Sequence, residues 1–136
     1  MTLAEINIFV QFAFLFCVLI SLQLRTVGKI KAFGISMTAI IVAFVVTFFS
    51  VFLAFPNDPM FTTHASTTLA SPTLTAAFGT HLALALLSLG AAVWTVVVWF
   101  RKTDFLAKSR IPALVTQFSW LIAFAFGLAM FVALNV

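Results

Sequence analysis

Residues 32–55 read AFGISMTAIIVAFVVTFFSVFLAF, a run of 24 residues without a single charged side chain. An α-helix of that length is about 36 Å long, which exceeds the ~30 Å hydrocarbon core of a bilayer. A helix of a soluble domain normally keeps one polar face toward water, and this run has none. We therefore predict a transmembrane helix over about residues 32–55.

Three further apolar stretches of similar length cover about residues 4–24, 76–100 and 111–135. Of the 136 residues, 64% are hydrophobic and 7% are charged, whereas a soluble domain carries about 25% charged residues. This composition excludes a water-soluble monomer, and with it a soluble nucleic-acid-binding protein. We predict an all-α fold, in which residues 1–136 form one integral membrane domain with four transmembrane helices running up-down-up-down.

Basic residues are confined to two of the three connections between these stretches. The segment 56–75 and both termini carry none, and the two basic connections contain Arg25, Lys29 and Lys31, then Arg101, Lys102, Lys108 and Arg110. The positive-inside rule places both basic connections in the cytoplasm. We therefore predict a multi-pass protein of the cell membrane, with its termini and the segment 56–75 outside.

The segment 56–75 is rich in Ser and Thr and begins with Pro56-Asn57-Asp58-Pro59. Proline removes a backbone donor and restricts the residue before it, so we expect the second helix to end here and a long loop to follow. Within this loop Met60 and His64, with Asp58 nearby, offer soft and imidazole ligands for copper. Met60 and His64 are therefore the candidate metal ligands, although one residue of each kind in a loop is a weak pattern.

His81 lies about one turn inside the stretch 76–100 and is the candidate cofactor-binding residue. An imidazole inside a membrane usually faces protein or water, and it can bind metal or haem. The alternative is a structural histidine, which would hydrogen-bond a neighbouring carbonyl or hydroxyl and set the register of its helix. A haem held between helices usually needs axial ligands from two spans, so a self-sufficient cytochrome is not expected.

Other reactive side chains are few, and no catalytic residue is predicted. No acidic or basic residue lies deep in any span, which argues against a proton-coupled transporter. Cys17, in the middle of the first span, is interpreted as a small buried hydrophobe. The polar residues of the spans are expected to hydrogen-bond between helices rather than line a pathway; they are Gln11, Thr47, Ser50, Thr116, Gln117 and Ser119.

A series of different short motifs follows along the chain from Gly28 onward. They are GKIKAFGISM over 28–37, Phe55-Pro56, FGTH over 78–81, Leu89-Gly90, the stretch 94–101, Pro112, Ser119-Trp120 and Gly127. In this order they resemble the small four-helix family of membrane proteins of unknown function that includes the YozB type. The resemblance implies an association with haem–copper terminal oxidases, for whose maturation some members of the family are needed.

The chain departs from that family at positions that often carry histidine. Phe33 stands where family members often have His, and Lys108 and Arg110 stand near the second basic turn where further histidines are frequent; His81 keeps its place. If the family's histidines handle haem or metal, this chain has lost part of that apparatus. The departure favours a structural subunit over a maturation factor.

Together, the residues and the resemblance favour a non-catalytic accessory or structural subunit of a larger membrane redox complex. The candidate hosts are a haem–copper terminal oxidase and a membrane-bound copper monooxygenase, with other membrane subunits and lipid as partners. The chain would carry no cofactor of its own, and any haem or copper would belong to the host. The alternative is a metal- or haem-handling assembly factor that uses His81; a small transporter is the third hypothesis.

Overall fold

The computed structural model describes residues 2–101 and 104–135, which are helical apart from short connections. Four of the helices in these ranges are long: α1 (Leu3–Thr26), α2 (Ile30–Ala54), α4 (Pro72–Arg101) and α6 (Arg110–Asn135). Each of the four is long and apolar enough to cross a membrane. The predicted all-α class is confirmed, and so is the presence of four helices long and apolar enough to span a membrane.

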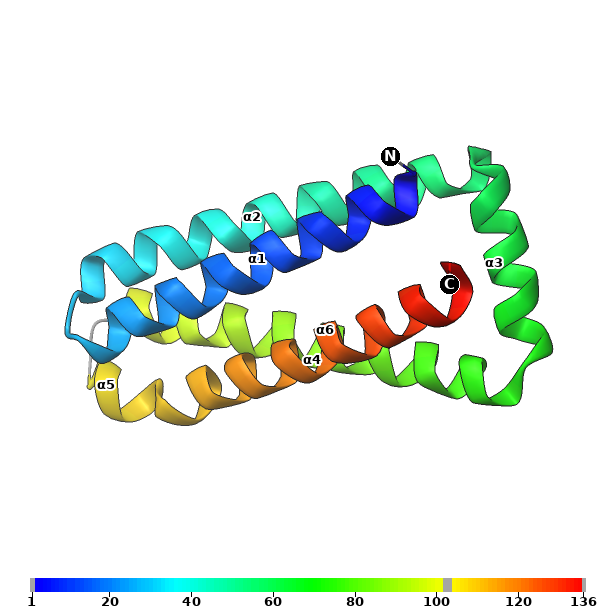
Figure 1. The fold of residues 1–136 in the computed structure, drawn as a ribbon. Coiled ribbons are helices and arrows are strands. Elements are labelled where there is room, and N and C mark those ends of the chain that lie inside the picture. Colours follow the sequence, from blue (N-terminus) through cyan, green and yellow to red (C-terminus); the bar gives the residue numbers. More distant parts are fainter. Residues whose placement is uncertain (1, 102–103, 136) are drawn as a thin grey trace.

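The long helices pack side by side around a common core (Figure 1). α1 packs on α2 and α4 packs on α6, while α1 also contacts α6 and α2 contacts α4. Both ends of the chain lie at the same end of the molecule as the short helix α3 (Pro59–Ala70). The turn between α1 and α2 lies at the opposite end, together with the four-residue helix α5 (Phe105–Lys108).

Local signals set both ends of α1. At its start the Thr2 hydroxyl accepts a hydrogen bond from the Glu5 N–H at 3.2 Å, and the Glu5 carboxylate accepts one from the Thr2 N–H at 2.6 Å. This capping box satisfies backbone donors that have no partner inside the helix. Past the end of α1, Gly28 adopts a φ of 85°, a left-handed conformation that glycine reaches at little cost. The chain can therefore reverse and begin α2 at Ile30.

The segment 56–75 is mostly helical, so the prediction of a long loop is wrong. The chain makes one 3-10 turn, η1 (Phe55–Asn57), then forms α3, and α4 begins directly after Ser71. In Figure 1, α3 runs across the end of the molecule and joins α2 to α4. The third long helix therefore begins four residues earlier than the predicted span, at Pro72 rather than at residue 76.

Two helix caps explain this difference. The Asp58 carboxylate accepts from the Met60 N–H at 3.2 Å and caps α3, while the Ser71 hydroxyl accepts from the Leu74 N–H at 3.3 Å and caps α4. The proline after each cap occupies the first helical position, where its missing N–H costs little. Asp-Pro and Ser-Pro are thus helix starts here, not only helix stops.

Three of the five Ser and Thr residues of α3 bond through their hydroxyls to the backbone of the helix itself, which makes them compatible with a helix. Thr63, Ser66 and Thr67 each donate to the carbonyl four residues earlier, at distances of 3.0 to 3.2 Å. Such bonding satisfies the hydroxyl hydrogens without a long loop or a partner.

The core is built from apolar side chains and a few paired hydroxyls. Each of the four long helices contributes fully buried side chains, among them Val18, Phe33, Met37, Thr95 and Thr116. Ser21 on α1 pairs with Ser36 on α2 at 2.7 Å, and Ser88 on α4 donates to Ser119 on α6 at 2.8 Å. Such pairs join helices where lipid offers no hydrogen-bond partner. Interhelical bonding is confirmed for Ser119, but the same prediction is wrong for Ser50 and Thr116, whose hydroxyls donate to carbonyls of their own helices.

Cys17 is exposed on α1, so its interpretation as a buried hydrophobe is wrong. The buried residues of α1 are Leu15, Val18, Ser21 and Leu22, at helical spacings that exclude position 17 from the packed face. A helix that is apolar on all sides gives no hydropathy signal for the face that meets protein. Position in the middle of a span was therefore a poor guide to burial.

Candidate functional site

His81 makes a hydrogen bond between helices. Its Nδ1 lies 2.6 Å from the backbone carbonyl oxygen of Ala123 on α6. Because a carbonyl can only accept, Nδ1 carries the hydrogen, and in the neutral ring the lone pair is on Nε2. This is the bond that we expect of a structural histidine.

Gly127 makes room for the imidazole against α6. A Cβ at Gly127 would lie 2.9 Å from Cε1 of His81 and 3.2 Å from Oε1 of Gln11. Since Gln11 belongs to α1, the imidazole lies at a junction of α1, α4 and α6. His81, Gln11 and Gly127 are thus brought together by packing, from three separate helices.

Met60 and His64 lie one turn apart on α3, and such spacing places two residues on one helix face. Met60 is exposed, His64 is partly buried, and Asp58 is engaged as the cap of the helix. Within residues 2–101 and 104–135, no group of three or more His, Cys, Asp or Glu residues could hold a metal ion.

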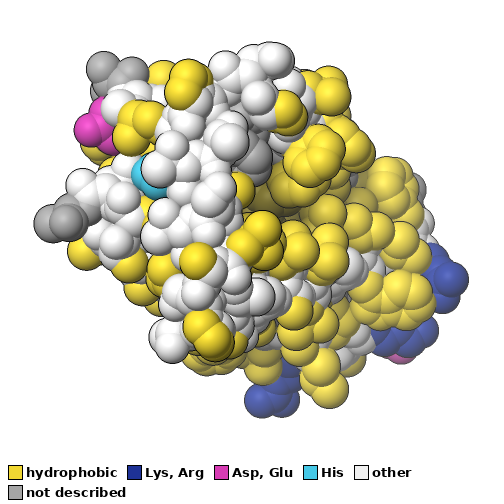
Figure 2. Space-filling model, turned by 90° about the vertical axis from the view of Figure 1, so that its right-hand side faces the viewer, with side chains coloured by type: hydrophobic (Ala, Val, Ile, Leu, Met, Phe, Trp, Pro, Cys, Tyr) yellow, Lys and Arg dark blue, Asp and Glu magenta, His cyan; other side chains and the backbone are white. Residues whose placement is uncertain are grey.

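The described basic residues lie at the end of the molecule opposite α3. Lys102, which was also predicted to set the topology, lies outside the described residues. Figure 2 looks at the α3 end, where the near face is almost free of charge and the Lys and Arg side chains appear at the far edge. Lys29, Lys31, Arg101, Lys108 and Arg110 are exposed, whereas Arg25 is partly buried.

Arg25 joins α1 to the segment of α5 and Ser109 at the basic end. Its Nε donates to the Ser109 hydroxyl at 2.8 Å, and its Nη2 donates to the Leu106 carbonyl at 2.7 Å. The guanidinium carbon also lies 5.9 Å from the ring centroid of Phe105. Arg25 therefore has a structural role in addition to its predicted role in topology.

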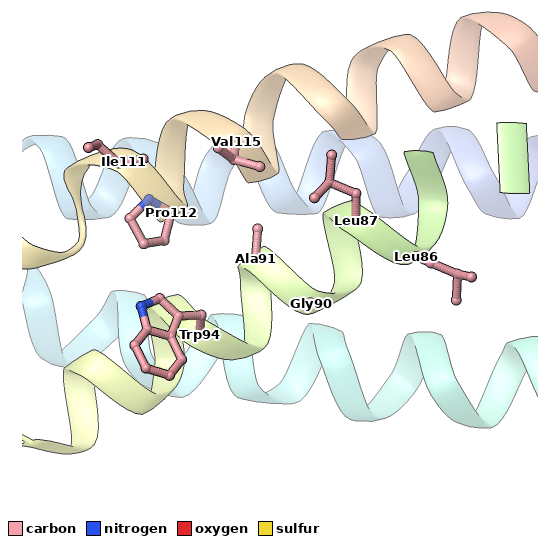
Figure 3. Close-up of a pocket in the computed structure, with 8 residues that line it drawn as sticks. All are labelled: Leu86, Leu87, Gly90, Ala91, Trp94, Ile111, Pro112 and Val115. Carbon is pink, nitrogen blue, oxygen red and sulfur yellow. The ribbon is translucent and has the colours of Figure 1, made fainter. Parts of the chain in front are cut away.

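A groove of about 430 Å³ runs between α4 and α6 on the outside of the molecule (Figure 3). Trp94 and Pro112 face each other across it, while Leu87 and Ala91 point toward Val115. These side chains are apolar except for the indole N–H of Trp94. The groove therefore offers a predominantly apolar surface.

Gly90 also lines the groove, and the space above it is open. Apart from its chain neighbours and the adjoining backbone of α4, no atom of the described residues lies within 4 Å of the position that a Cβ at Gly90 would take. A methyl group added there would enter the open space of the groove.

No protein family, no characterised protein and no solved structure matches this chain. The resemblance to the YozB-type family thus rests on the sequence motifs alone.

Two features escaped the sequence-based search for functional residues. The bond from Arg25 to Ser109 joins positions 84 residues apart, and no local pattern signals it. The groove has local signals in the small pair Gly90-Ala91 and in Pro112 after the basic turn. Only the packing of α4 against α6 brings those signals together.

Proposed function

We propose that this chain is a non-catalytic accessory subunit of a larger membrane redox complex, either a haem–copper terminal oxidase or a membrane-bound copper monooxygenase. The observation that carries the proposal is the apolar groove between α4 and α6, which has no side chain over Gly90. Small residues let helix backbones approach closely in a membrane. A transmembrane helix of the host would lie in this groove. The family resemblance, and not the groove, supports a redox complex as the host.

The polar groups inside the bundle support scaffolding rather than chemistry. Ser88 bonds to Ser119, Ser21 pairs with Ser36, and His81 bonds to the carbonyl of Ala123. Each of these contacts holds two helices together, as interhelical polar contacts in membranes commonly do.

The first test is gentle detergent extraction from native membranes, followed by blue-native electrophoresis and mass spectrometry of the band that contains this chain. We expect the chain to migrate with the catalytic subunits of an oxidase or a monooxygenase. A band that holds this chain and no partner would contradict the proposal.

Replacing Gly90 with leucine should separate the chain from its host. The leucine Cβ has open space beyond the adjoining backbone of α4, so the fold should persist while the docked helix is displaced. We expect the amount of chain in the host band to fall about tenfold, because overpacking an interface costs roughly 1–3 kcal/mol.

Gly79→Leu is the matched control, since Gly79 also lies on α4, has no atom within 4 Å of a Cβ and lies outside the groove. This variant should assemble as the unmodified chain does. Equal losses in both variants, or no loss in Gly90→Leu, would show that the groove is not where the host binds.

A second candidate function is a metal- or haem-handling assembly factor, and one observation favours it. Metal-binding histidines usually donate one ring N–H to a carbonyl or carboxylate, which orients the other nitrogen as the ligand. The bond from Nδ1 of His81 to Ala123 matches that arrangement. A Soret band or stoichiometric copper in the purified chain would favour this function over the first, with the remaining ligands supplied by a partner.

We also propose that the basic end faces the cytoplasm, so that α3 and both termini lie outside and the spans run up-down-up-down. The separation of the basic residues from the α3 end supports this orientation. In a Cys17→Ala background, Thr73→Cys should react with a membrane-impermeant maleimide in intact cells, and Lys29→Cys should not. The reverse pattern of labelling would overturn this topology.

A further inference from the structure

A cavity of about 240 Å³ lies between α1 and α6 at the basic end of the molecule. Arg25 and Thr26 on α1 and Arg110 and Gln117 on α6 supply its polar lining. Leu22 and Leu114 supply apolar lining, and both lie further along their helices from the basic turns. The cavity thus combines cationic groups with an apolar wall that continues toward the middle of the spans.

The two arginines have no acidic partner in this cavity. Its lining holds no Asp or Glu, and the positive charges of Arg25 and Arg110 are close enough to repel each other. In the described parts of the chain, the side chains of Arg110 and Gln117 make no hydrogen bond or ion pair. An anion in the cavity would relieve the repulsion and would take up donors that the protein itself leaves free.

Arg25 is already oriented for such a ligand. Its bonds to Ser109 and Leu106 use Nε and one N–H group of Nη2, and an arginine side chain has five N–H donors. The remaining donors are held in position by these contacts with Ser109 and Leu106. Little side-chain entropy would therefore be lost when an anion binds.

We infer that this cavity binds the phosphate group of an anionic membrane phospholipid. Arg25 and Arg110 hold the phosphate oxygens, the Gln117 amide donates a further hydrogen bond, and Leu22 and Leu114 contact the start of an acyl chain. The recognised chemistry is a phosphate anion, and the apolar wall favours a lipid headgroup over free phosphate as its source. Basic pockets between transmembrane helices bind such headgroups in general. Such a lipid would bind here whichever host complex the chain joins.

The test is native mass spectrometry of the full-length chain in mixed micelles that contain phosphatidylglycerol or phosphatidylcholine. We expect the chain to retain phosphatidylglycerol preferentially, and Arg110→Gln to weaken that retention about fivefold. Arg110 contributes no side-chain hydrogen bond to the fold in the described residues, so this variant should fold normally. Equal retention of the two lipids by the unmodified chain would overturn the inference.

Lys31→Gln is the charge-matched control, because Lys31 is exposed on α2 near the same end and lies outside the cavity. It should change retention by less than about twofold, since an exposed charge at a distance is screened by salt. If Lys31→Gln weakens retention as much as Arg110→Gln does, the effect is diffuse surface charge and the site is excluded.

Thermal unfolding in a neutral detergent distinguishes the two sources of phosphate. Stabilisation by phosphatidylglycerol but not by inorganic phosphate supports the lipid headgroup. Equal stabilisation by inorganic phosphate would assign the cavity to the free anion and overturn the lipid assignment. Stabilisation by neither would overturn the site itself.

Discussion

Replacing Gly34 with alanine is expected to lower the free energy of unfolding by about 3 kcal/mol, at the upper end of the usual cost of overpacking. Gly34 lies on α2 directly against Trp99 of α4, and a Cβ at this position would overlap atoms of the indole ring. Because these are ring atoms and not the end of a flexible chain, the indole must be displaced, or α2 and α4 must separate, to admit the methyl group. Unfolding by sodium dodecyl sulfate in mixed micelles, followed by tryptophan fluorescence, measures the change.

The sign of this effect is diagnostic. Alanine is the better helix former by up to about 1 kcal/mol, so a glycine that only weakened α2 would give a more stable protein when replaced. Gly79→Ala is the control, since no atom lies within 4 Å of its Cβ, and it should leave stability equal or higher. In the double variant Gly34→Ala/Trp99→Ala the two losses should be less than additive. An unchanged Gly34→Ala would mean that the indole moves aside at no cost.

Arg25→Gln is expected to lower the free energy of unfolding by about 3 kcal/mol, since hydrogen bonds to charged groups contribute roughly 1.5–3 kcal/mol. The change removes the bonds to the Ser109 hydroxyl and the Leu106 carbonyl, and the contact with the Phe105 ring. Ser109 is fully buried, so water replaces the lost donor poorly. The same titration in mixed micelles measures the loss.

Two further variants separate the geometry of Arg25 from its charge. Lys29→Gln makes the same change of charge at an exposed position of the same turn and should have little effect on stability. Arg25→Lys should restore only part of the loss, because one ammonium group cannot reproduce a planar fork with donors on separate nitrogens. If Lys29→Gln destabilises the protein as much as Arg25→Gln, net charge and not the Arg25 contact would be responsible.

The long helices were predictable because their signals are local. The charge-free run over 32–55 and the stretches around it gave boundaries close to those of α1, α2, α4 and α6. Hydropathy over about 20 residues is enough for this, since crossing a bilayer demands a continuous apolar segment. The signals for α3 are also local, because Asp58-Pro59 and Ser71-Pro72 start helices as well as stopping them.

The candidate sites depended on contacts between distant parts of the chain. His81 was singled out from its chemistry, but its partner Ala123 is 42 residues away, and Arg110 and Gln117 became part of a cavity only through the packing of α6 against α1. A pattern within one helix can indicate that two residues share a face. It cannot indicate which other helix that face meets.

The amino-acid sequence alone dictates that this chain forms long helices apolar enough to span a membrane, because composition and hydropathy act over each segment independently of the others. Tertiary structure alone decided which faces pack, as the exposure of Cys17 and the contact of Gly34 with Trp99 illustrate. The physical reason is that both lipid and protein interior accept apolar side chains. Shape and the pairing of a few polar groups, such as Arg25 with Ser109, therefore choose the neighbours that hydrophobicity leaves open.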